Sequence, residues 1–588
     1  MLIDKGVLQQ DGQWTGERES EIAVPPTIQA LLEARLDALA REERAVVEPA
    51  SVVGLEFARS AVEWLTPPSV RETIDSQLSA LTRKQFIRPV EAKGDQLVHR
   101  FHHQLVRDTV YTALLKRTRA TLHVEFVRWA DRINAESDRG REFEAILGYH
   151  LEQAYRYLGE LGPLDARALA LGRDGAQRLA AAGRRAFARG DTLAAANLLQ
   201  RAAALLPSDD PQRLALLPET AEVLLGLGNY SAARANLNDA EATAEQQSNT
   251  RVKAAARLIG LFASMYSGEG SDDADDPLQV VHRLIAELER ENAHVELATA
   301  WRLVVLIHGM AGRYAKASEA VVQAVEHARR AGDERLLAKN GLMMSNIAML
   351  GPTSVGEAML ECESLIAAGL ADRQVECKVM CVLAVLMAMN SELEAARALY
   401  RRARTMLRDL GQGVFAASTG IEVACVELLG GDLALAEREV RTDYEFLEKT
   451  GETYYLSTMA ALLARIVRDQ GRDDEALSLS RTAEKASGED DVESQALWRA
   501  VRAPILARSG NFDTAEQLAR SGVELTRRTE SPVLQAEAMT ELAHVLMLAG
   551  KTSAARAAVV DAIALHRSKG NVTGESQCVE WMEQIAVA

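Results

Sequence analysis

Three histidines near the start of the chain are the first residues whose type and spacing suggest chemistry. His99, His102 and His103 could offer imidazole nitrogens to a metal ion, because histidine is a common zinc ligand. The segment has no nearby cysteine, however, and no fourth ligand at a familiar spacing. Since structural zinc sites take four protein ligands, we expect no metal site here.

The segment around these histidines is basic, although the whole chain is acidic. Residues 81–120 hold nine Lys and Arg against three acids, whereas the full chain has a net charge of -17. The acidic total disfavours nonspecific nucleic-acid binding, but a local basic group can contact DNA or a nucleotide phosphate. The basic residues that could face DNA or phosphate are Arg83, Lys84, Arg88, Lys93 and Arg100.

Other candidate residues have structural explanations. Gly550-Lys551-Thr552 matches the end of a P-loop, but the first glycine of that motif would fall at Val545. Cys377 and Cys381 share a helix face, and their apolar neighbours indicate buried side chains instead of ligands. No Ser–His–Asp or Cys–His arrangement is evident from spacing. We therefore expect no catalytic residue, no bound cofactor and no enzymatic activity in this chain alone.

A repeated turn motif indicates which elements would position such residues. The pattern Gly-x-[Tyr/Phe/Leu]-x-x-Ala, or a close variant, returns about every 40 residues, at Gly190, Gly228, Gly312, Ser391, Gly431, Gly471, Gly510 and Gly550. The glycine allows a left-handed turn that ends one helix. Small or apolar residues 5, 9 and 12 positions later fit one face of a second helix. Degenerate copies near Gly270 and Gly351 fill the two wider gaps.

Self-similarity with this period is typical of stacked repeat proteins. The motif predicts an all-α chain whose last part is a right-handed solenoid of helical hairpins similar to tetratricopeptide repeats. The extra residues per unit favour helices about one turn longer than in the 34-residue repeat. Such arrays usually bind other molecules, so the repeat favours a recognition function.

Composition agrees with this interpretation. Aromatic residues make up only 5% of the chain, and no apolar run reaches the roughly 18 residues that cross a bilayer. No signal peptide is evident at Met1, and the five cysteines lack the regular spacing of a disulfide framework. We therefore expect a cytoplasmic protein that does not enter a membrane.

The first quarter of the chain has a different organisation. Amphipathic patterns predict helices at residues 27–39, 42–53 and 69–84, followed by a β-hairpin over residues 86–101. Three helices and then a hairpin is the order of a winged-helix domain. The predicted parts are the tail of a missing nucleoside triphosphatase (NTPase) domain with a linker (1–24), a winged-helix domain (25–125), a helical bridge (126–185) and tetratricopeptide-like repeats (186–588).

Five stretches carry a family resemblance. They are residues 24–39 (VPPTIQALLEARLDAL), 50–54 (ASVVG), 101–111 (FHHQLVRDTVY), 146–155 (ILGYHLEQAY) and 178–186 (RLAAAGRRA). They resemble the region after the ATPase core of bacterial signal-transduction ATPases with numerous domains (STAND proteins), especially those fused to class III adenylate or guanylate cyclases. The resemblance covers residues 1 to about 240. It implies a P-loop ATPase domain as a partner in cis or in trans, with ATP or ADP as its ligand.

The resemblance also implies a role for His103. In related sensors, a winged-helix histidine within a Met-His-Asp motif contacts the β-phosphate of bound ADP. Residues 102–104 line up with this motif, with Gln104 in place of the aspartate. The alternative from the residues alone is that His102 and His103 cap the helix that follows.

The predicted function is the sensor or scaffold region of a multidomain signal-transduction ATPase. The solenoid would bind a protein, a peptide or a small ligand, and the winged helix would pass this occupancy to the ATPase. The resemblance implies that the output is cyclic-nucleotide synthesis or transcription. Two alternatives stay open: a stand-alone adaptor of the tetratricopeptide type, and a DNA-binding regulator that uses the basic winged helix.

Overall fold

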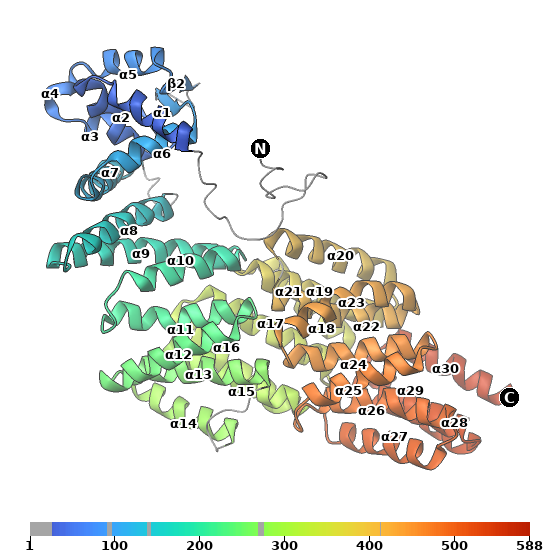
Figure 1. The fold of residues 1–588 in the computed structure, drawn as a ribbon. Coiled ribbons are helices and arrows are strands. Elements are labelled where there is room, and N and C mark those ends of the chain that lie inside the picture. The colour runs from blue at the N-terminus through green and yellow to red at the C-terminus, as the bar shows by residue number, and fades with distance from the viewer. Residues whose placement is uncertain (1–25, 91–96, 138–142, 269–275, 412, 588) are drawn as a thin grey trace. The chain divides into compact units, whose positions relative to one another are not determined.

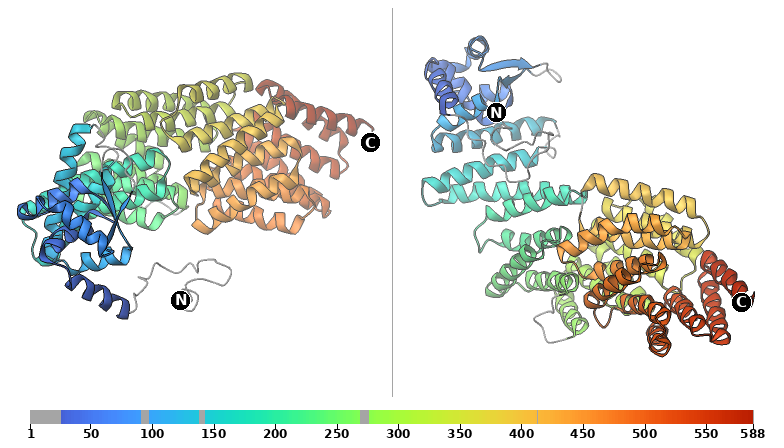
Figure 2. Two further views of the ribbon diagram at one scale, coloured as in Figure 1. Left: turned by 90° about the horizontal axis from the view of Figure 1, so that it is seen from above. Right: turned by 45° about the vertical axis from the view of Figure 1, so that its right-hand side comes forward.

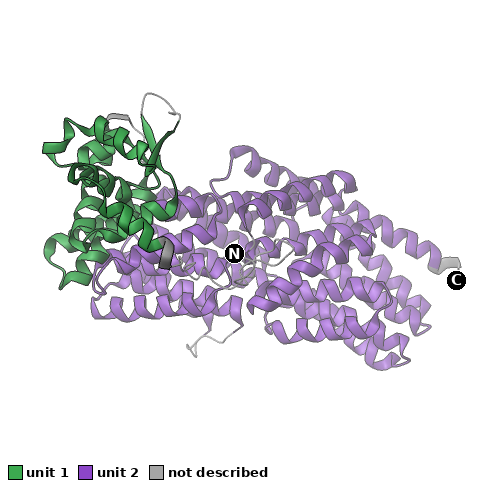
Figure 3. Ribbon diagram, turned by 45° about the horizontal axis from the view of Figure 1, so that its top comes forward, with its two compact units in different colours: residues 1–179 green, residues 180–588 purple. Residues whose placement is uncertain are grey.

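The computed structural model describes residues 26–90, 97–137, 143–268, 276–411 and 413–587. It divides the chain into two compact units, residues 1–179 (unit 1) and residues 180–588 (unit 2), each described by itself (Figure 3). The predicted tail at residues 1–24, Lys93, and the degenerate repeat at Gly270 lie outside the described residues. None of the described helices is apolar over a length that could cross a bilayer.

Unit 1 begins with short helices and a small sheet. Its elements are α1 (Pro26–Asp37), α2 (Arg41–Val53), β1 (Glu56–Ala58), α3 (Arg59–Leu65), α4 (Pro68–Arg71), α5 (Ile74–Arg83), β2 (Ile87–Val90), β3 (Val98–Phe101) and α6 (Gln104–Ala113). The strands are antiparallel in the order β1-β3-β2, and Ile87 of β2 pairs with Phe101 of β3. Both side chains are buried with Phe57 of β1 in one apolar core.

The sequence predicted this order of helices and hairpin with two omissions. The third predicted helix is divided into α4 and α5, and helix α3 precedes it. Strand β1 was missed because three residues show no alternating pattern by themselves; they become a strand by pairing with β3. The assignment of these elements to a winged-helix domain stays a prediction.

The rest of unit 1 consists of long helices. α7 (Lys116–Ser137) contains residue 125, where the predicted winged-helix domain ends, and it packs on α8 (Glu144–Leu161). Between them, His123 Nδ1 lies 2.8 Å from His150 Nδ1. Burial lowers the pKa of His123 to about 2 and that of His150 to about 3, so this contact joins two neutral rings. The boundary between the units falls within α9 (Ala166–Ala188).

Helical hairpins follow one another along unit 2 (Figure 1). We call the first helix of each hairpin its A-helix and the second its B-helix. The pairs are α9 with α10 (Thr192–Ala204), α11 (Pro211–Gly226) with α12 (Tyr230–Gln246), α13 (Thr250–Ser267) with α14 (Pro277–Arg290), α15 (His294–Met310) with α16 (Tyr314–Ala331), and α17 (Glu334–Leu350) with α18 (Val355–Ala368). They continue as α19 (Arg373–Met389) with α20 (Leu393–Leu410), α21 (Val414–Ser418) and α22 (Gly420–Gly430) with α23 (Leu433–Thr450), α24 (Tyr454–Asp469) with α25 (Asp473–Ala486), α26 (Val492–Arg508) with α27 (Phe512–Arg527), and α28 (Pro532–Leu548) with α29 (Thr552–Lys569), before the last helix α30 (Val572–Val587).

The turn motif has the conformation that the sequence predicted. Its eight turn residues have φ between 66° and 86°, including the non-glycine Ser391 at 67°. The copy predicted near Gly270 turns at Gly268 (φ 63°), whereas Gly351 is extended. The alanines five positions after the eight turn residues, from Ala195 to Ala555, are fully buried. The solenoid of tetratricopeptide-like hairpins is therefore confirmed, and its right-handed superhelix stays a prediction.

Helices that lie five hairpins apart in the sequence touch one another. α11 contacts α21, α13 contacts α24, α17 contacts α28, and α19 contacts α30. In both views of Figure 2 the yellow and orange part of unit 2 lies beside its green part. Hydrogen bonds also join later hairpins to earlier ones. Gln374 Nε2 donates to Gly190 O (3.0 Å), Thr453 N to Tyr266 O (2.7 Å), Glu530 N to Gly312 O (2.9 Å) and Thr573 Oγ1 to Ala388 O (2.6 Å). A simple solenoid contacts only its neighbours, so these bonds close the superhelix from one turn to the next.

Lys569, the last residue of α29, makes a fully buried contact of this kind. Its Nζ donates to the carbonyl oxygens of Ala348 (2.7 Å), Gly351 (2.7 Å) and Thr353 (2.5 Å). These oxygens lie at and just after the C-terminal end of α17, where carbonyls lack helical donors and carry partial negative charge. The ammonium group therefore satisfies three acceptors and fastens the tenth hairpin to the fifth.

Replacing Lys569 by methionine should test this contact. The variant keeps an apolar stem but leaves three buried carbonyls without a donor, so we expect the free energy of unfolding to fall by about 2–3 kcal/mol. Amide hydrogen exchange in α29 and at the end of α17 should become faster. Lys551→Met is the control, because exposed Lys551 starts the same helix and pairs with Glu516 at 2.6 Å. Equal losses in urea denaturation of the two variants would contradict the assignment.

Candidate functional site

The A-helices of unit 2 surround a cavity of about 340 Å³. Its lining residues come from α9 to α28, and nearly all lie on A-helices or at the turns. A-helices such as α19 bury residues all round, whereas the B-helix α20 buries the single stripe Ala396, Tyr400, Ala403 and Leu407. The volume falls within the range of small-molecule sites, near its lower end.

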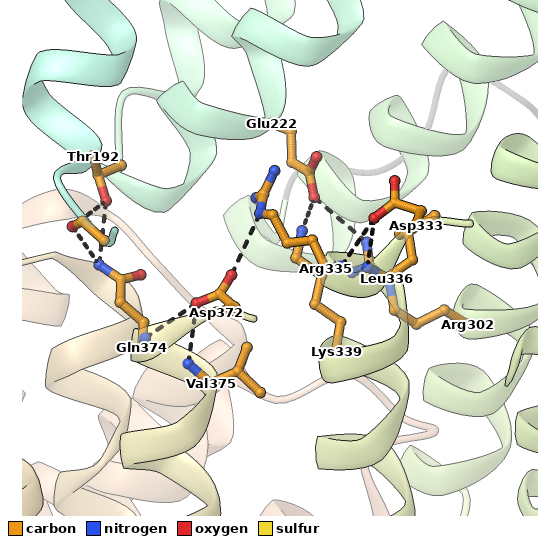
Figure 4. A network of polar contacts seen from close by, with 11 residues as sticks. Thr192, Glu222, Arg302, Asp333, Arg335, Leu336, Lys339, Asp372, Gln374 and Val375 are labelled. Atoms are coloured by element: carbon orange, nitrogen blue, oxygen red, sulfur yellow. Dashed lines mark hydrogen bonds and ion pairs between the residues drawn. The ribbon is translucent and has the colours of Figure 1, made fainter. Parts of the chain in front are cut away.

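Two cations share one carboxylate on this lining. Lys339 of α17 donates from Nζ to Glu222 Oε1 on α11, and Arg302 of α15 places Nη2 3.7 Å from the same oxygen (Figure 4). Burial alone would raise the pKa of Glu222, but the charges of Lys339, Arg335 and Arg302 outweigh it and hold this pKa well below its ordinary value. Burial lowers the pKa of Lys339 to about 8 against the opposing effect of Glu222.

A third cation, Arg335, lies beside this pair. Its guanidinium carbon is 3.5 Å from the centroid of the Phe187 ring, and its Nε donates to Asp372 Oδ2 at 3.4 Å. Asp372 also caps α19, where its other oxygen accepts from the backbone N–H groups of Gln374 (3.1 Å) and Val375 (3.2 Å) (Figure 4). We call Arg302, Arg335 and Lys339 the cationic group. Among the residues that the structure describes, the ion pairs of these three side chains are with two carboxylates, Glu222 and Asp372.

Two nitrogens of the cationic group have no acceptor in the part of the chain that the structure describes. They are Nη2 of Arg335 and Nε of Arg302, and both atoms are buried. Buried donors without acceptors are costly, because burial removes water and supplies no replacement. An anionic ligand group would supply the missing acceptors.

Carboxylates gather at the start of α26 on another part of the lining. Asp491 caps the helix, accepting from Ser494 N (3.1 Å) and Ser457 Oγ (3.0 Å). Glu493 makes no hydrogen bond or ion pair with any of the described residues. Burial, together with the charges of Asp491, Glu537 and Glu422, raises the pKa of Glu493 to about 8. We call Asp491 and Glu493 the acidic group.

The remaining lining is apolar or internally neutralised. Lys378 and Glu422 form a pair at 2.7 Å, with side chains only 5% and 6% exposed. Tyr266 of α13 packs against Tyr454 and Tyr455 of α24, with ring centroids 5.5 and 6.0 Å away. Apolar side chains complete the surface, among them Leu342, Met343, Ile347, Val385 and Ile421. The cavity thus combines a cationic part, an acidic part and an apolar, aromatic part.

The residues singled out from the sequence lie in unit 1 and do not form this cavity. His103 is exposed and is the N-cap of α6, where its Nδ1 accepts from Leu105 N at 3.1 Å. This capping is the structural alternative given for it above, and its nucleotide contact stays a prediction. Lys84 pairs with Glu43 at 2.6 Å and Arg100 with Glu56 at 3.1 Å, whereas Arg83 and Arg88 are exposed.

Sequence reasoning missed every charged residue of the cavity. The available signal was a charge within an apolar A-helix, as at Lys378 in the segment ECKVMCVLAV. Cys377 and Cys381 in the same segment are buried in the apolar core, as interpreted from their neighbours. Gly550 and Lys551 lie in the turn between α28 and α29, and Thr552 begins α29, again as interpreted.

Neither a protein-family profile nor a curated protein matches the sequence. Similar solved structures include a signal-transduction ATPase with numerous domains and a tetratricopeptide repeat sensor from Pyrococcus horikoshii (14% identity, TM-score 0.28, covering 96% of this chain and 68% of that one). A second is a Rap protein complexed with competence and sporulation factor (14% identity, TM-score 0.38, covering 58% of this chain and 98% of that one). A third is yeast Tom70 (13% identity, TM-score 0.30, covering 78% of this chain and 96% of that one). At these TM-scores the similarities assign neither a ligand nor a function to this chain.

Replacing Glu222 by glutamine should destabilise unit 2. Lys339 and Arg302 would lose their shared negative charge inside the cavity, and we expect a loss between the ~1 kcal/mol of an exposed pair and the ~3–5 kcal/mol of a buried one. The double variant Glu222→Gln/Lys339→Met should regain part of this stability. Urea denaturation of wild type, Glu222→Gln, Lys339→Met and the double variant measures the coupling; additive effects of the two substitutions would contradict it.

Glu493 should make the stability of unit 2 depend on pH. Its pKa is about 8 in the folded chain and 4.5 ordinarily, so the folded state binds more protons and stability falls as pH rises between these values. The loss approaches about 1.4 kcal/mol for each unit by which the pKa is raised. Glu493→Gln should show a smaller loss than wild type, and the part that remains comes from Glu452, whose pKa burial also raises to about 8. Glu489→Gln, at an exposed position just before α26, should keep the full loss. Parallel pH profiles of wild type and Glu493→Gln would refute the assignment.

Proposed function

We propose that this chain is a sensor or adaptor region that binds a peptide or a protein segment in the cavity of unit 2. The observation that carries the proposal is the convergence of charged side chains from Glu222 to Glu493 on one cavity. Burying charges without full pairing costs stability, so such groups are expected where a ligand completes them. Binding, with no catalysis by this chain alone, is the function that this arrangement supports best.

We further propose that occupancy of the cavity is passed through unit 1 to a P-loop ATPase domain, in cis or in trans. The support is the resemblance of residues 1 to about 240 to STAND proteins, together with helices, a β-hairpin and a third strand in the order β1-β3-β2. These elements suit a winged helix. Exposed His103 would be accessible to ADP held by such a domain. The output would be a cyclase or transcriptional activity in the cytoplasm.

Two observations weigh against DNA binding through unit 1. Lys84 and Arg100 already pair with Glu43 and Glu56, which leaves fewer cations for phosphate contacts.

A stand-alone adaptor would use the same cavity without any nucleotide link. The ATPase-linked sensor and the stand-alone adaptor differ in one measurable property. In the presence of a P-loop domain, the affinity of the cavity for its ligand should depend on ADP for the sensor and should not depend on ADP for the adaptor.

Filling the cavity should weaken ligand binding without unfolding the chain. Gly309 of α15 lines the cavity, and a Cβ placed there meets no atom within 4 Å. Leucine at this position would extend into the open space and would also favour the helix by up to about 1 kcal/mol. Gly260→Leu in α13 is the matched control, because it too meets no atom within 4 Å but does not line the cavity.

The assay offers random peptides of three to eight residues to the full chain, separates bound from free peptide by size exclusion, and identifies the retained peptides by mass spectrometry. Wild type and Gly260→Leu should retain the same peptides, and Gly309→Leu should retain at least about tenfold less, since a filled site loses over 1.4 kcal/mol. Equal retention by Gly309→Leu, or no retention by wild type, would contradict the proposed function.

A further inference from the structure

Among the described residues, the cavity has polar side-chain groups without partners on different helices. The cationic group on α15 and α17 has two buried nitrogens without acceptors among the described residues. The acidic group on α26 includes Glu493, whose carboxyl group has no hydrogen-bond or ion-pair partner in the same described set. A cation bound beside it would hold this group in its charged form. By contrast, Lys378 and Glu422 satisfy each other and need no ligand. A ligand that satisfies both groups must therefore bring acceptors to the cationic group and a donor to Glu493.

A single small anion would satisfy only the first group. It would fill the acceptor positions at Arg302 and Arg335 but would leave the carboxyl group of Glu493 without a partner. A purely apolar ligand would satisfy neither group. A ligand with a negative group at one end, a positive group at the other and an apolar stem between them matches all three parts of the lining.

We propose that the ligand is a short peptide with free ends, whose terminal carboxylate binds Arg302, Arg335 and Lys339 and whose terminal ammonium binds Glu493 and Asp491. This inference rests on the proposed function of the cavity and names its ligand class. Guanidinium groups bind carboxylates through paired, charge-assisted hydrogen bonds, and capture of peptide termini is an established mode of recognition.

The middle of the peptide would contact the apolar and aromatic lining. Tyr266, Tyr454 and Met343 present large, adaptable surfaces that suit apolar side chains. A peptide backbone of three to eight residues spans roughly 10 to 28 Å when extended, at about 3.5 Å per residue. The library in the test covers this range.

The test uses peptides of three to eight residues built only from uncharged amino acids, so that the termini carry all of the charge. Four forms are compared: free, N-acetylated, C-amidated and doubly blocked. The full chain should retain the free form best, and each block should weaken binding about 10- to 100-fold, the effect of one or two charge-assisted hydrogen bonds. Retention is measured by size exclusion and mass spectrometry.

Matched variants assign each end to its group. Arg335→Gln should remove most of the penalty of C-amidation and leave that of N-acetylation, and Glu493→Gln should do the reverse. The controls are Arg329→Gln and Glu489→Gln at exposed positions outside the lining. Circular dichroism and Tm establish that each variant is folded, and Arg335→Lys, which keeps the charge, should restore part of the amidation penalty.

Each outcome decides a different point. Preference for the free form, with penalties that follow the two variants, supports the proposal. Equal retention of the free and doubly blocked peptides overturns the assignment of the ends but leaves the cavity as a peptide site. No retention of any form by wild type, with the charged random library also not retained, overturns the proposed function as well.

Discussion

The structure of unit 2 depends on the contacts between hairpins that lie five apart in the sequence. Stacking of neighbours alone would give an open array whose inner surface is wetted throughout. The bonds from Gln374, Thr453 and Glu530 to the turns of earlier hairpins close this array upon itself. The cavity, its burial of charge and the low solvent access of Lys378 all follow from that closure. The ligand site is therefore a property of the superhelix as a whole.

The hairpins themselves were predictable because their signals are local. A left-handed turn residue and an alanine five positions later act within one hairpin, so the spacing of Gly471 and Ala476 is enough to recognise it. The same holds for the hairpin of β2 and β3, but not for β1, which becomes a strand only beside β3. Periodicity thus predicts the elements whose partners are close in sequence.

The cavity could not be predicted from local patterns in the sequence. Glu222 and Lys339 are 117 residues apart, and they meet because the superhelix brings α11 to α17. Neither residue stands in a motif, and each taken alone resembles a charge on a solvated helix face. The difference between Lys378, which is buried, and Lys551, which is exposed, depends on which helix of the hairpin carries it. Only the three-dimensional closure reveals which charges face inward.

The contact of Lys569 with the end of α17 has a consequence for how this protein can evolve. A linear repeat array tolerates the gain or loss of a unit, because each new unit meets the same neighbours. In unit 2 an added hairpin between α18 and α29 would move Lys569 out of register with the carbonyls of Ala348 and Gly351. The closure thus fixes the number of hairpins per turn. We therefore expect this protein to diverge by substitution of side chains on the cavity lining and not by gain or loss of hairpins.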